Sequence, residues 1–239
     1  MDKITEAIEQ KECTIDIFLD LSKAFDTVDH SILLSKLGHY GIRFIALEWF
    51  KNYLHDRQQI VKYNETLSKS ETVKCGVPQE SVLGPLLFII YINDIHRSST
   101  IFQYILFADD TNLFLQHQNL NQMIQIANQE IKNVSQWLDS NKLTLNVSKT
   151  NFMIFKTRKK KINMPVRITI KDKNTEQVKS TKFLGIRIDE NMTWKTHISF
   201  ITNKISKLSG VITKLRHYLD INTVKKRLLH NDISISHIL

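Results

Sequence analysis

Apolar positions along the chain follow the spacing of buried strands in some segments and of amphipathic helices in others. Segment 15–21 is mostly apolar and ends at polar Asp20 and Ser22, which predicts a buried strand. Apolar residues recur at helical spacing between Leu120 and Leu138, which predicts a helix over about 119–140. Further helices are predicted at about 31–39, 44–54, 81–97, 195–218 and 222–230, and strands at 58–63, 71–75, 102–107, 111–116, 152–155 and 182–188. Segment 156–180 is basic and poor in strand signals, and a hairpin with a loose connection is predicted there.

The order of these elements predicts an α+β fold. If segment 31–75 is an insertion, the order is strand, helix, strand–strand hairpin, helix, strand. This is the split βαβ order of ferredoxin-like folds. Right-handed crossovers then put the first strand beside the second hairpin strand, with its C-terminal end level with the hairpin turn. Asp20 and the turn residues Asp109 and Asp110 are therefore predicted to meet at one end of the sheet.

Three carboxylates at one point need a counter-cation, because like charges in contact cannot all remain ionised otherwise. Oxygen ligands favour a hard cation such as Mg²⁺, which also binds substrate phosphates. Two such ions about 4 Å apart form the clamp of nucleotidyl transfer. The alternative for Asp109 and Asp110 taken alone is turn chemistry, since Asp is common in turns.

Composition and charge narrow the class of protein. The 239 residues are 42% apolar with six Gly and three Pro, so the chain is neither disordered nor fibrous. The two Cys residues have no disulfide or zinc spacing, and no apolar run reaches the length of a membrane span. Residues 1–155 hold 14 Lys and Arg against 18 Asp and Glu, whereas residues 156–239 hold 19 against 6. The basic second part is either a set of solvated helix faces or a surface for a polyanion such as nucleic acid.

Five segments resemble the motifs of reverse transcriptases from non-LTR retrotransposons, especially jockey-type elements. The motifs are Phe18 to His30, Gly76 to Phe88 continued by Tyr91 to Asp94, Phe107 to Thr111, Leu143 to Thr150, and Phe183 to Asp189. They occur in the family's order and cover about residues 15–195. The resemblance implies an RNA-directed DNA polymerase that uses two Mg²⁺ ions, with Mn²⁺ as the alternative ion. Its expected partners are an RNA template, a DNA primer and deoxynucleoside triphosphates, with no membrane.

The resemblance also implies roles for individual residues. Asp20, Asp109 and Asp110 would be catalytic and bind the metal ions, together with the backbone of Leu21. The nucleotide would be bound by Ser22, Lys23, Ala24, Phe25, Gln79 and Lys149. Phe183, Leu184 and Gly185 would form the primer grip. Phe25 would be the steric gate against a ribose 2′-hydroxyl, or else a plain core aromatic. Lys149 would approach the triphosphate, or else be a surface lysine.

Two features depart from the family pattern. The family has Gly where this chain has Glu80, whose charge would repel the triphosphate unless it faces solvent or a nearby Lys. The fingers region that precedes the first motif in relatives is missing, so a partner chain would have to supply it. We therefore expect a palm with a split βαβ core over 1–190 and the start of a basic helical thumb over 191–239.

Two other functions compete with the polymerase. One is a catalytically inactive fragment of a retrotransposon that acts at most as a nucleic-acid-binding module. The other is a nucleotide cyclase with the same palm core, which the second and fifth motifs disfavour because they contact template and primer. The expected location is intracellular, in the nucleus or the cytoplasm, and Lys159 to Lys161 is the only basic cluster that resembles an import signal.

Overall fold

The computed structural model describes residues 2–10, 12–78, 81–157, 165–215 and 218. Its first half contains α1 (Asp2–Glu9), β1 (Cys13–Leu19), the 3-10 helix η1 (Ala24–Asp26), α2 (His30–His39), α3 (Phe44–Leu54), β2 (Gln58–Gln59), β3 (Lys62–Tyr63), β4 (Thr66–Leu67), β5 (Glu71–Thr72), α4 (Leu83–Ile92) and the 3-10 helix η2 (Asn93–Ser98). Its second half contains β6 (Gln103–Phe107), β7 (Asp110–His117), α5 (Leu120–Ser140), β8 (Asn151–Phe155), β9 (Thr169–Ile170), β10 (Lys173–Asn174), β11 (Glu176–Gln177), β12 (Ser180–Phe183), β13 (Ile186–Asp189) and α6 (Lys195–Leu215).

A central sheet in the order β11-β8-β1-β7-β6 positions the candidate site. β1 is antiparallel to both β7 and β8, and Leu19 at its end pairs with Thr111. The prediction that the first strand lies beside the second hairpin strand, with its end level with the turn, is therefore confirmed.

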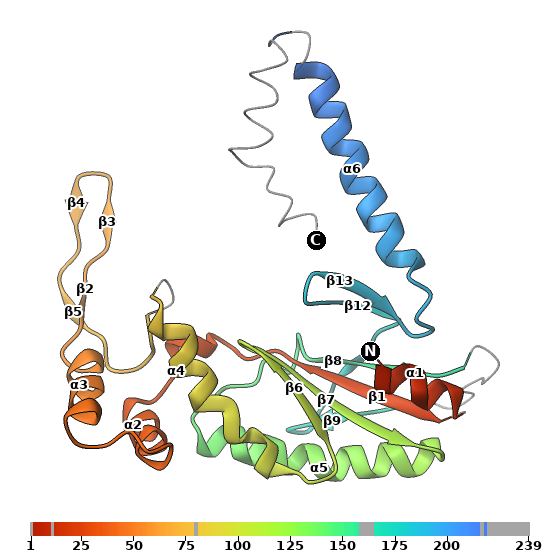
Figure 1. Ribbon diagram of the computed structural model, residues 1–239, viewed down its shortest axis with the longest axis horizontal. Helices are drawn as coiled ribbons and strands as arrows, with labels where there is room; N and C mark the ends of the chain where they lie inside the picture. The colour runs from red at the N-terminus through yellow and green to blue at the C-terminus, as the bar shows by residue number, and fades with distance from the viewer. Residues whose placement is uncertain (1, 11, 79–80, 158–164, 216–217, 219–239) are drawn as a thin grey trace.

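The two faces of the sheet are buried by different elements. Alternate β1 residues such as Ile15 and Ile17 pack with the apolar face of α5 and with α4. The opposite face carries Phe114 and Met153, which pack with Ile4 of α1 and Ile188 of β13. Figure 1 shows α5 running along one side of the sheet, with α1 and the β12–β13 hairpin on the other.

Several predicted boundaries need correction. The helix expected over 81–97 ends at Ile92 and continues as the 3-10 helix η2. The strand expected over 182–188 is a hairpin, because Leu184 and Gly185 adopt φ values of 47° and 83° and form a two-residue turn. The pair expected at 58–63 and 71–75 divides into two short ladders, β2 with β5 and β3 with β4, which together form an arm (58–72). The periodicity of the apolar residues did not reveal α1.

The arm and α6 project from the same side of the central sheet (Figure 1). The start of α6 is fixed by Asp189, a buried carboxylate that accepts hydrogen bonds from the Thr193 N–H and hydroxyl. Further along, the Arg187 guanidinium lies 4.7 Å from the ring centre of Phe200. α6 confirms a helix over 195–215, whereas the helix expected over 222–230 and the cluster Lys159 to Lys161 lie outside the described residues.

No helix within the described residues is both long enough and apolar enough to cross a membrane.

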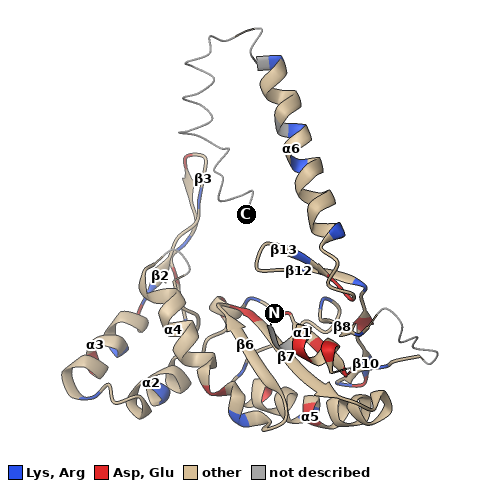
Figure 2. Cartoon of the chain, turned by 45° about the vertical axis from the view of Figure 1, so that its right-hand side comes forward, with Lys and Arg blue, Asp and Glu red and all other residues tan. Residues whose placement is uncertain are grey.

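Figure 2 shows basic positions distributed along α6, which has no acidic residue.

Lys36 joins α2 to α4 and α5 through a half-buried cation. Its ammonium donates to the Tyr91 carbonyl at 2.6 Å, pairs with Asp94, and lies 4.7 Å from the ring centre of Trp137. We expect Lys36→Met to lower the free energy of unfolding by about 2 kcal/mol, because it leaves Asp94 without a partner and removes the ring contacts. Urea unfolding would measure this change.

Lys51 is the matched control for Lys36. It pairs with Glu48 at 3.4 Å, but both side chains are more than half exposed. Lys51→Met should therefore change the free energy of unfolding by less than about 0.5 kcal/mol. Equal effects of the two substitutions would contradict the role given to Lys36.

Candidate active site

Asp20 follows β1 directly and is fixed by the loop that precedes β8. Its backbone N–H donates to Thr150 Oγ1 at 3.3 Å, and its carbonyl accepts from the Asn146 N–H at 2.8 Å. The loop is closed on itself, because the Thr150 hydroxyl also donates to the Asn146 carbonyl at 3.0 Å. One loop therefore holds the main chain of Asp20 on both sides, and this loop also carries Lys149.

The neighbouring Leu21 pairs with Leu145 in an isolated antiparallel bridge. The two bonds of this bridge are made by the Asp20 carbonyl and by the Ser22 N–H, which donates to the Thr144 carbonyl at 2.8 Å. In such a non-hydrogen-bonded pair, the N–H and C=O of Leu21 itself point away from Leu145. They therefore point to the side of β1 on which β7 lies.

Asp109 and Asp110 lie at the turn between β6 and β7. Phe107 pairs with Asp110, so Ala108 and Asp109 are the two turn residues, and Ala108 has a φ of 51°. Because Leu19 pairs with Thr111, the next positions along the two antiparallel strands are Asp20 and Asp110. Opposed residues of an antiparallel pair project from the same face with their Cβ atoms about 5 Å apart.

The electrostatics of Asp110 agree with this register. Burial, followed by the negative charges of Asp109 and Asp20, raises the pKa of the Asp110 carboxyl, and the Lys182 ammonium opposes this shift. Asp20 and Asp110 also line one small pocket of about 120 Å³. The complete lining is Phe18, Leu19, Asp20, Asp110, Asn112, Lys149, Asn151, Thr181, Lys182 and Phe183.

Two amide side chains in this pocket have buried polar atoms without a partner, namely Asn112 Nδ2 and Asn151 Oδ1. No group of three or more His, Cys, Asp or Glu side chains suited to a metal ion occurs among the described residues. The two carboxylates that line the pocket are oxygen ligands, which have the chemistry that a hard cation needs. Metal binding by Asp20, Asp109, Asp110 and Leu21 stays a prediction.

Four of the residues expected to bind the nucleotide, Ser22 to Phe25, form one segment, and Lys149 lies apart from them on the loop before β8. Ser22 and Lys23 lead into η1, where Ala24 is buried and the Phe25 ring lies 4.8 Å from that of Phe88. The loop after the arm is attached to this helix, because the Val77 N–H donates to the Phe25 carbonyl at 2.8 Å. Gln79 and Glu80 lie outside the described residues. The nucleotide contacts, including the steric gate at Phe25, therefore stay predictions.

The predicted primer grip occupies the β12–β13 hairpin. Leu184 and Gly185 form its turn, and Phe183 packs against Phe18 of β1 with ring centres 6.3 Å apart. This aromatic contact places the hairpin beside the carboxylate pocket. Its contact with a primer stays a prediction.

Sequence reasoning missed several residues that line the pocket. Asn112 and Asn151 flank Phe18 on β7 and β8, and Lys182 directly precedes the predicted primer grip. Lys182 could have been found, since a lysine beside the fifth motif adds a cation near the site. The two asparagines give no signal of their own, because only the register brings them together.

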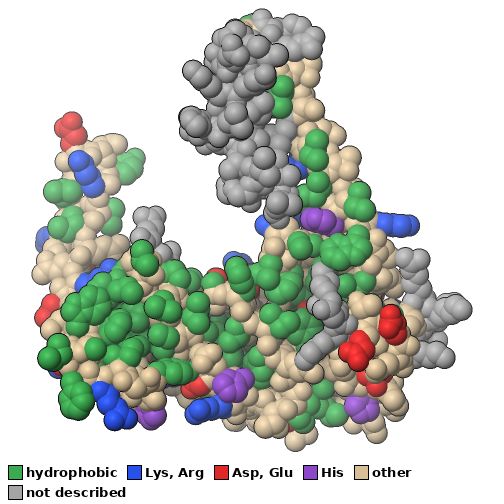
Figure 3. Space-filling model, viewed as in Figure 1, with side chains coloured by type: hydrophobic (Ala, Val, Ile, Leu, Met, Phe, Trp, Pro, Cys, Tyr) green, Lys and Arg blue, Asp and Glu red, His purple; other side chains and the backbone are tan. Residues whose placement is uncertain are grey.

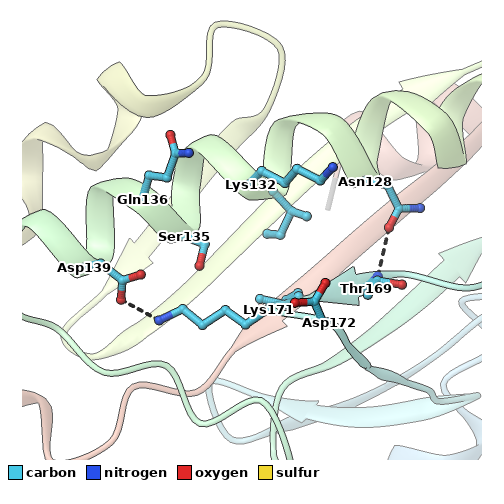
Figure 4. Close-up of a pocket in the computed structure, with 10 residues that line it drawn as sticks. Asn128, Lys132, Ser135, Gln136, Asp139, Thr169, Lys171 and Asp172 are labelled. Carbon is cyan, nitrogen blue, oxygen red and sulfur yellow. Dashed lines mark hydrogen bonds and ion pairs between the residues drawn. The ribbon is translucent and has the colours of Figure 1, made fainter.

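The pocket with the carboxylates is smaller than another cavity in the protein. A cavity of about 730 Å³ lies between α5 and the β9–β10 hairpin (Figure 4). The Thr169 N–H donates to Asn128 Oδ1 at 2.8 Å, and Lys171 pairs with Asp139. None of the residues predicted to act in catalysis lines it.

Comparison with known proteins identifies the family. Residues 1–188 match the family described as reverse transcriptase (RNA-dependent DNA polymerase). The chain belongs to the reverse transcriptase family. This match spans β1 with the following Asp20, the turn with Asp109 and Asp110, and the β12–β13 hairpin up to Ile188.

Relatives of this reverse transcriptase chain are polymerases of Drosophila mobile elements. It is 26% identical over 245 residues to a probable RNA-directed DNA polymerase from transposon X-element of Drosophila melanogaster, covering 98% of this chain and 25% of that protein. It is 25% identical over 218 residues to the RNA-directed DNA polymerase from mobile element jockey of the same species, covering 87% and 23%. The jockey-type resemblance is thereby confirmed, and the chain spans about a quarter of the length of these relatives.

Solved structures with a similar fold include telomerases. An apo telomerase from Candida tropicalis, truncated from its C-terminal domain, matches with a TM-score of 0.53 at 14% identity, covering 81% of this chain and 38% of that one. A Candida albicans telomerase in complex with a fragment of telomeric RNA matches with a TM-score of 0.51 at 14% identity, covering 84% and 36%. At this identity the likeness shows the mixed α+β fold alone.

Proposed function

We propose that the pocket of Asp20 and Asp110 is the active site of an RNA-directed DNA polymerase of a non-LTR retrotransposon. The observation that supports the proposal is the register of β1 and β7, which ends with Leu19 paired to Thr111, one position before Asp20 and Asp110, together with the pocket that both carboxylates line. Family membership supports the same reaction. The substrates would be an RNA template, a DNA primer and deoxynucleoside triphosphates.

The reaction transfers a nucleotide to the primer. The primer 3′-oxygen forms a bond to the α-phosphorus, the bond to the β-phosphate oxygen breaks, pyrophosphate leaves, and the 3′-hydroxyl proton goes to solvent. Divalent ions, when bound, make the 3′-hydroxyl more acidic and neutralise the leaving pyrophosphate. Asp20, Asp109 and Asp110 with the Leu21 carbonyl would hold two Mg²⁺ ions, or Mn²⁺ in their place. Lys149 would approach the triphosphate from the loop that fixes Asp20.

The strand order supports a palm. In the order β8-β1-β7-β6 every neighbouring pair is antiparallel. Helices lie between β1 and β6 and between β7 and β8, whereas β6 and β7 are joined by a tight turn. We interpret this arrangement as the split βαβ core of ferredoxin-like folds. The palm would extend over residues 1–190, with α6 beginning a thumb over 191–239.

Charge supports a nucleic-acid partner for this thumb. α6 carries Lys195, Lys204, Lys207 and Lys214 without an acidic residue, and it projects from the body on the side of the arm (Figures 1 and 2). Phosphate contacts from such lysines would make the affinity for primer–template fall with salt.

An exposed apolar surface supports a further polypeptide partner. Phe44 and Ile45 at the start of α3 are 87% and 88% exposed, and Trp49 is half exposed. Figure 3 shows hydrophobic side chains gathered over the region of α2–α4. Surfaces of this kind usually mark an interaction site. A further polypeptide segment that packs on α3 would cover it.

A second candidate function is the catalytically inactive fragment that the sequence also allows, and the basic helix α6 supports its binding to nucleic acid. In this alternative, the chain is a nucleic-acid-binding module that keeps the palm and the basic helix without turnover. It would bind primer–template but would not extend it.

Primer extension on an RNA template tests the polymerase. We expect the full chain with Mg²⁺ to add nucleotides to a labelled DNA primer, and the Asp109→Ala variant to add none, because a carboxylate of the metal site is lost. The products would be resolved by denaturing electrophoresis, and EDTA should stop the reaction.

The controls distinguish the two functions. Equal extension by the wild-type chain and the Asp109→Ala variant would identify a contaminating polymerase and remove the proposal. Equal binding of primer–template by both proteins, with extension by neither, would support the binding module. Fluorescence anisotropy of the labelled duplex measures that binding.

A further inference from the structure

Two lysines approach the carboxylate pocket from different elements. Lys149 comes from the loop before β8, and Lys182 comes from β12, one residue before Phe183. Neither lysine takes part in the ion pairs within 4.0 Å that the described residues form. The pocket therefore combines two cations with Asp20 and Asp110 without a fixed ion pair.

Lys182 acts on Asp110 at a distance. Its side chain lines the same small pocket as the Asp110 and Asp20 carboxylates, so its positive charge lies near both. The side chain is exposed, so its ammonium is free to move while remaining near the site. The position of its backbone is set by the contact between the rings of Phe183 and Phe18.

An independent observation is that the side-chain amide of Asn112, which lines this pocket, has no hydrogen-bond acceptor. Its side chain is 2% exposed, and its Nδ2 has no hydrogen-bond acceptor. A buried donor without an acceptor is costly unless a ligand supplies one. An oxygen-rich group such as a phosphate, entering between the lysines and the carboxylates, would supply it.

We propose that Lys182 is an exchangeable counter-charge of the polymerase site. In the metal-free protein its ammonium balances the carboxylates of Asp110 and Asp20. When Mg²⁺ takes over that role, the ammonium is released toward the phosphate of the primer terminus. Lys182 is thus a positioning residue, and this inference rests on the proposed polymerase function.

The exchange predicts effects of opposite sign in one variant. Lys182→Met should tighten Mg²⁺ binding about fivefold, because a competing positive charge near a doubly charged ion is removed. The same variant should bind primer–template about threefold to tenfold more weakly. The slope of its log affinity against log salt concentration should fall by about one, as expected for one lost phosphate contact. If Lys182 only supported the local structure, its replacement by Met would weaken both Mg²⁺ binding and primer–template binding.

The experiment uses the full chain and MgCl₂ as the probe. Mg²⁺ affinity is read from the rise in melting temperature with MgCl₂ concentration, and primer–template affinity from fluorescence anisotropy at several salt concentrations. Lys182→Arg keeps the charge and should behave as wild type in both. Lys173→Met removes the same charge from β10, outside the pocket, and should leave Mg²⁺ affinity unchanged.

The outcomes separate this inference from the proposed function. Wild-type stabilisation by Mg²⁺ that is lost in Asp20→Ala and in Asp20→Asn, but unchanged in Lys182→Met, would overturn the role of Lys182 alone. Weaker Mg²⁺ binding in Lys182→Met would overturn it as well. No stabilisation of the wild-type chain by Mg²⁺ would remove the metal site, and both proposals with it.

Discussion

Replacing Asp16 by Val is expected to raise the free energy of unfolding by about 3 kcal/mol at pH 7. Asp16 lies in the middle of β1, fully buried, and neither carboxyl oxygen has a hydrogen-bond partner. Its cross-strand neighbours are Phe114 and Met153, which belong to the apolar face under α1. Val suits this strand position and removes the polar group without creating a large cavity.

The same carboxyl gives the protein an unusual dependence on pH. Burial raises the pKa of Asp16 well above its ordinary value. The folded chain therefore keeps a proton that the unfolded chain loses near pH 4. The stabilising effect is complete below that pH and is lost as the pH rises toward the folded-state pKa, by about 1.4 kcal/mol for each unit.

Other carboxyls act in separate ways. The pKa of Asp110 is also raised, so its ionisation changes stability with pH in the same direction as that of Asp16. A hydrogen bond from Lys142 lowers the pKa of Asp29, so its contribution is lost only below about pH 4. Between pH 5 and pH 8 the fall in stability should come mainly from Asp16, whose pKa is raised well above its ordinary value.

Urea unfolding at several pH values from 5 to 8 would measure the effect. Asp16→Asn is the matched control, because it stays polar and buried but has no proton to lose. It should flatten the pH dependence without the gain expected of Asp16→Val. A wild-type chain whose stability rises over this range would contradict the assignment.

Gly84→Ala is expected to lower the free energy of unfolding by about 3 kcal/mol. A Cβ at this position would lie 1.9 Å from the Pro78 carbonyl oxygen, which is backbone. The turn there is already closed by Ser81, whose hydroxyl donates to that carbonyl at 2.8 Å and accepts from the Gly84 N–H at 2.9 Å. The substitution would therefore displace Pro78 or the start of α4.

Gly38 provides the control within the same protein. It lies in α2, and a Cβ there would meet nothing within 4 Å. Gly38→Ala should raise stability by up to about 1 kcal/mol, since Ala favours helix more than Gly. Thermal or urea unfolding of the two variants would show changes of opposite sign. A neutral Gly84→Ala would mean that the turn can open without cost.

The sequence predicted those elements in which local pattern and tertiary contacts agree. The apolar face of α5 is buried against the sheet that its periodicity indicated. The β6–β7 hairpin and its position beside β1 followed from strand order and the handedness of crossovers. The β12–β13 hairpin was missed because Leu184 is an ordinary strand residue by type, and only its left-handed φ makes the turn.

For the candidate site too, some features could be predicted from the sequence and others only from the structure. The chain itself determined that Asp20, Asp109 and Asp110 belong to a polymerase motif set, because those residues occur in order with their neighbours. It could not show that Asp16, at the centre of an apolar strand, is buried without a partner.

Residue types and their order were thus enough to name the family and to predict which carboxylates serve its chemistry. Only the tertiary structure decided which side chains share their surroundings, such as Asn112, Asn151 and Lys182 beside Asp20 and Asp110. The reason is physical: strand register and the φ angles at turns bring together residues far apart in the chain, and no local pattern records those neighbours.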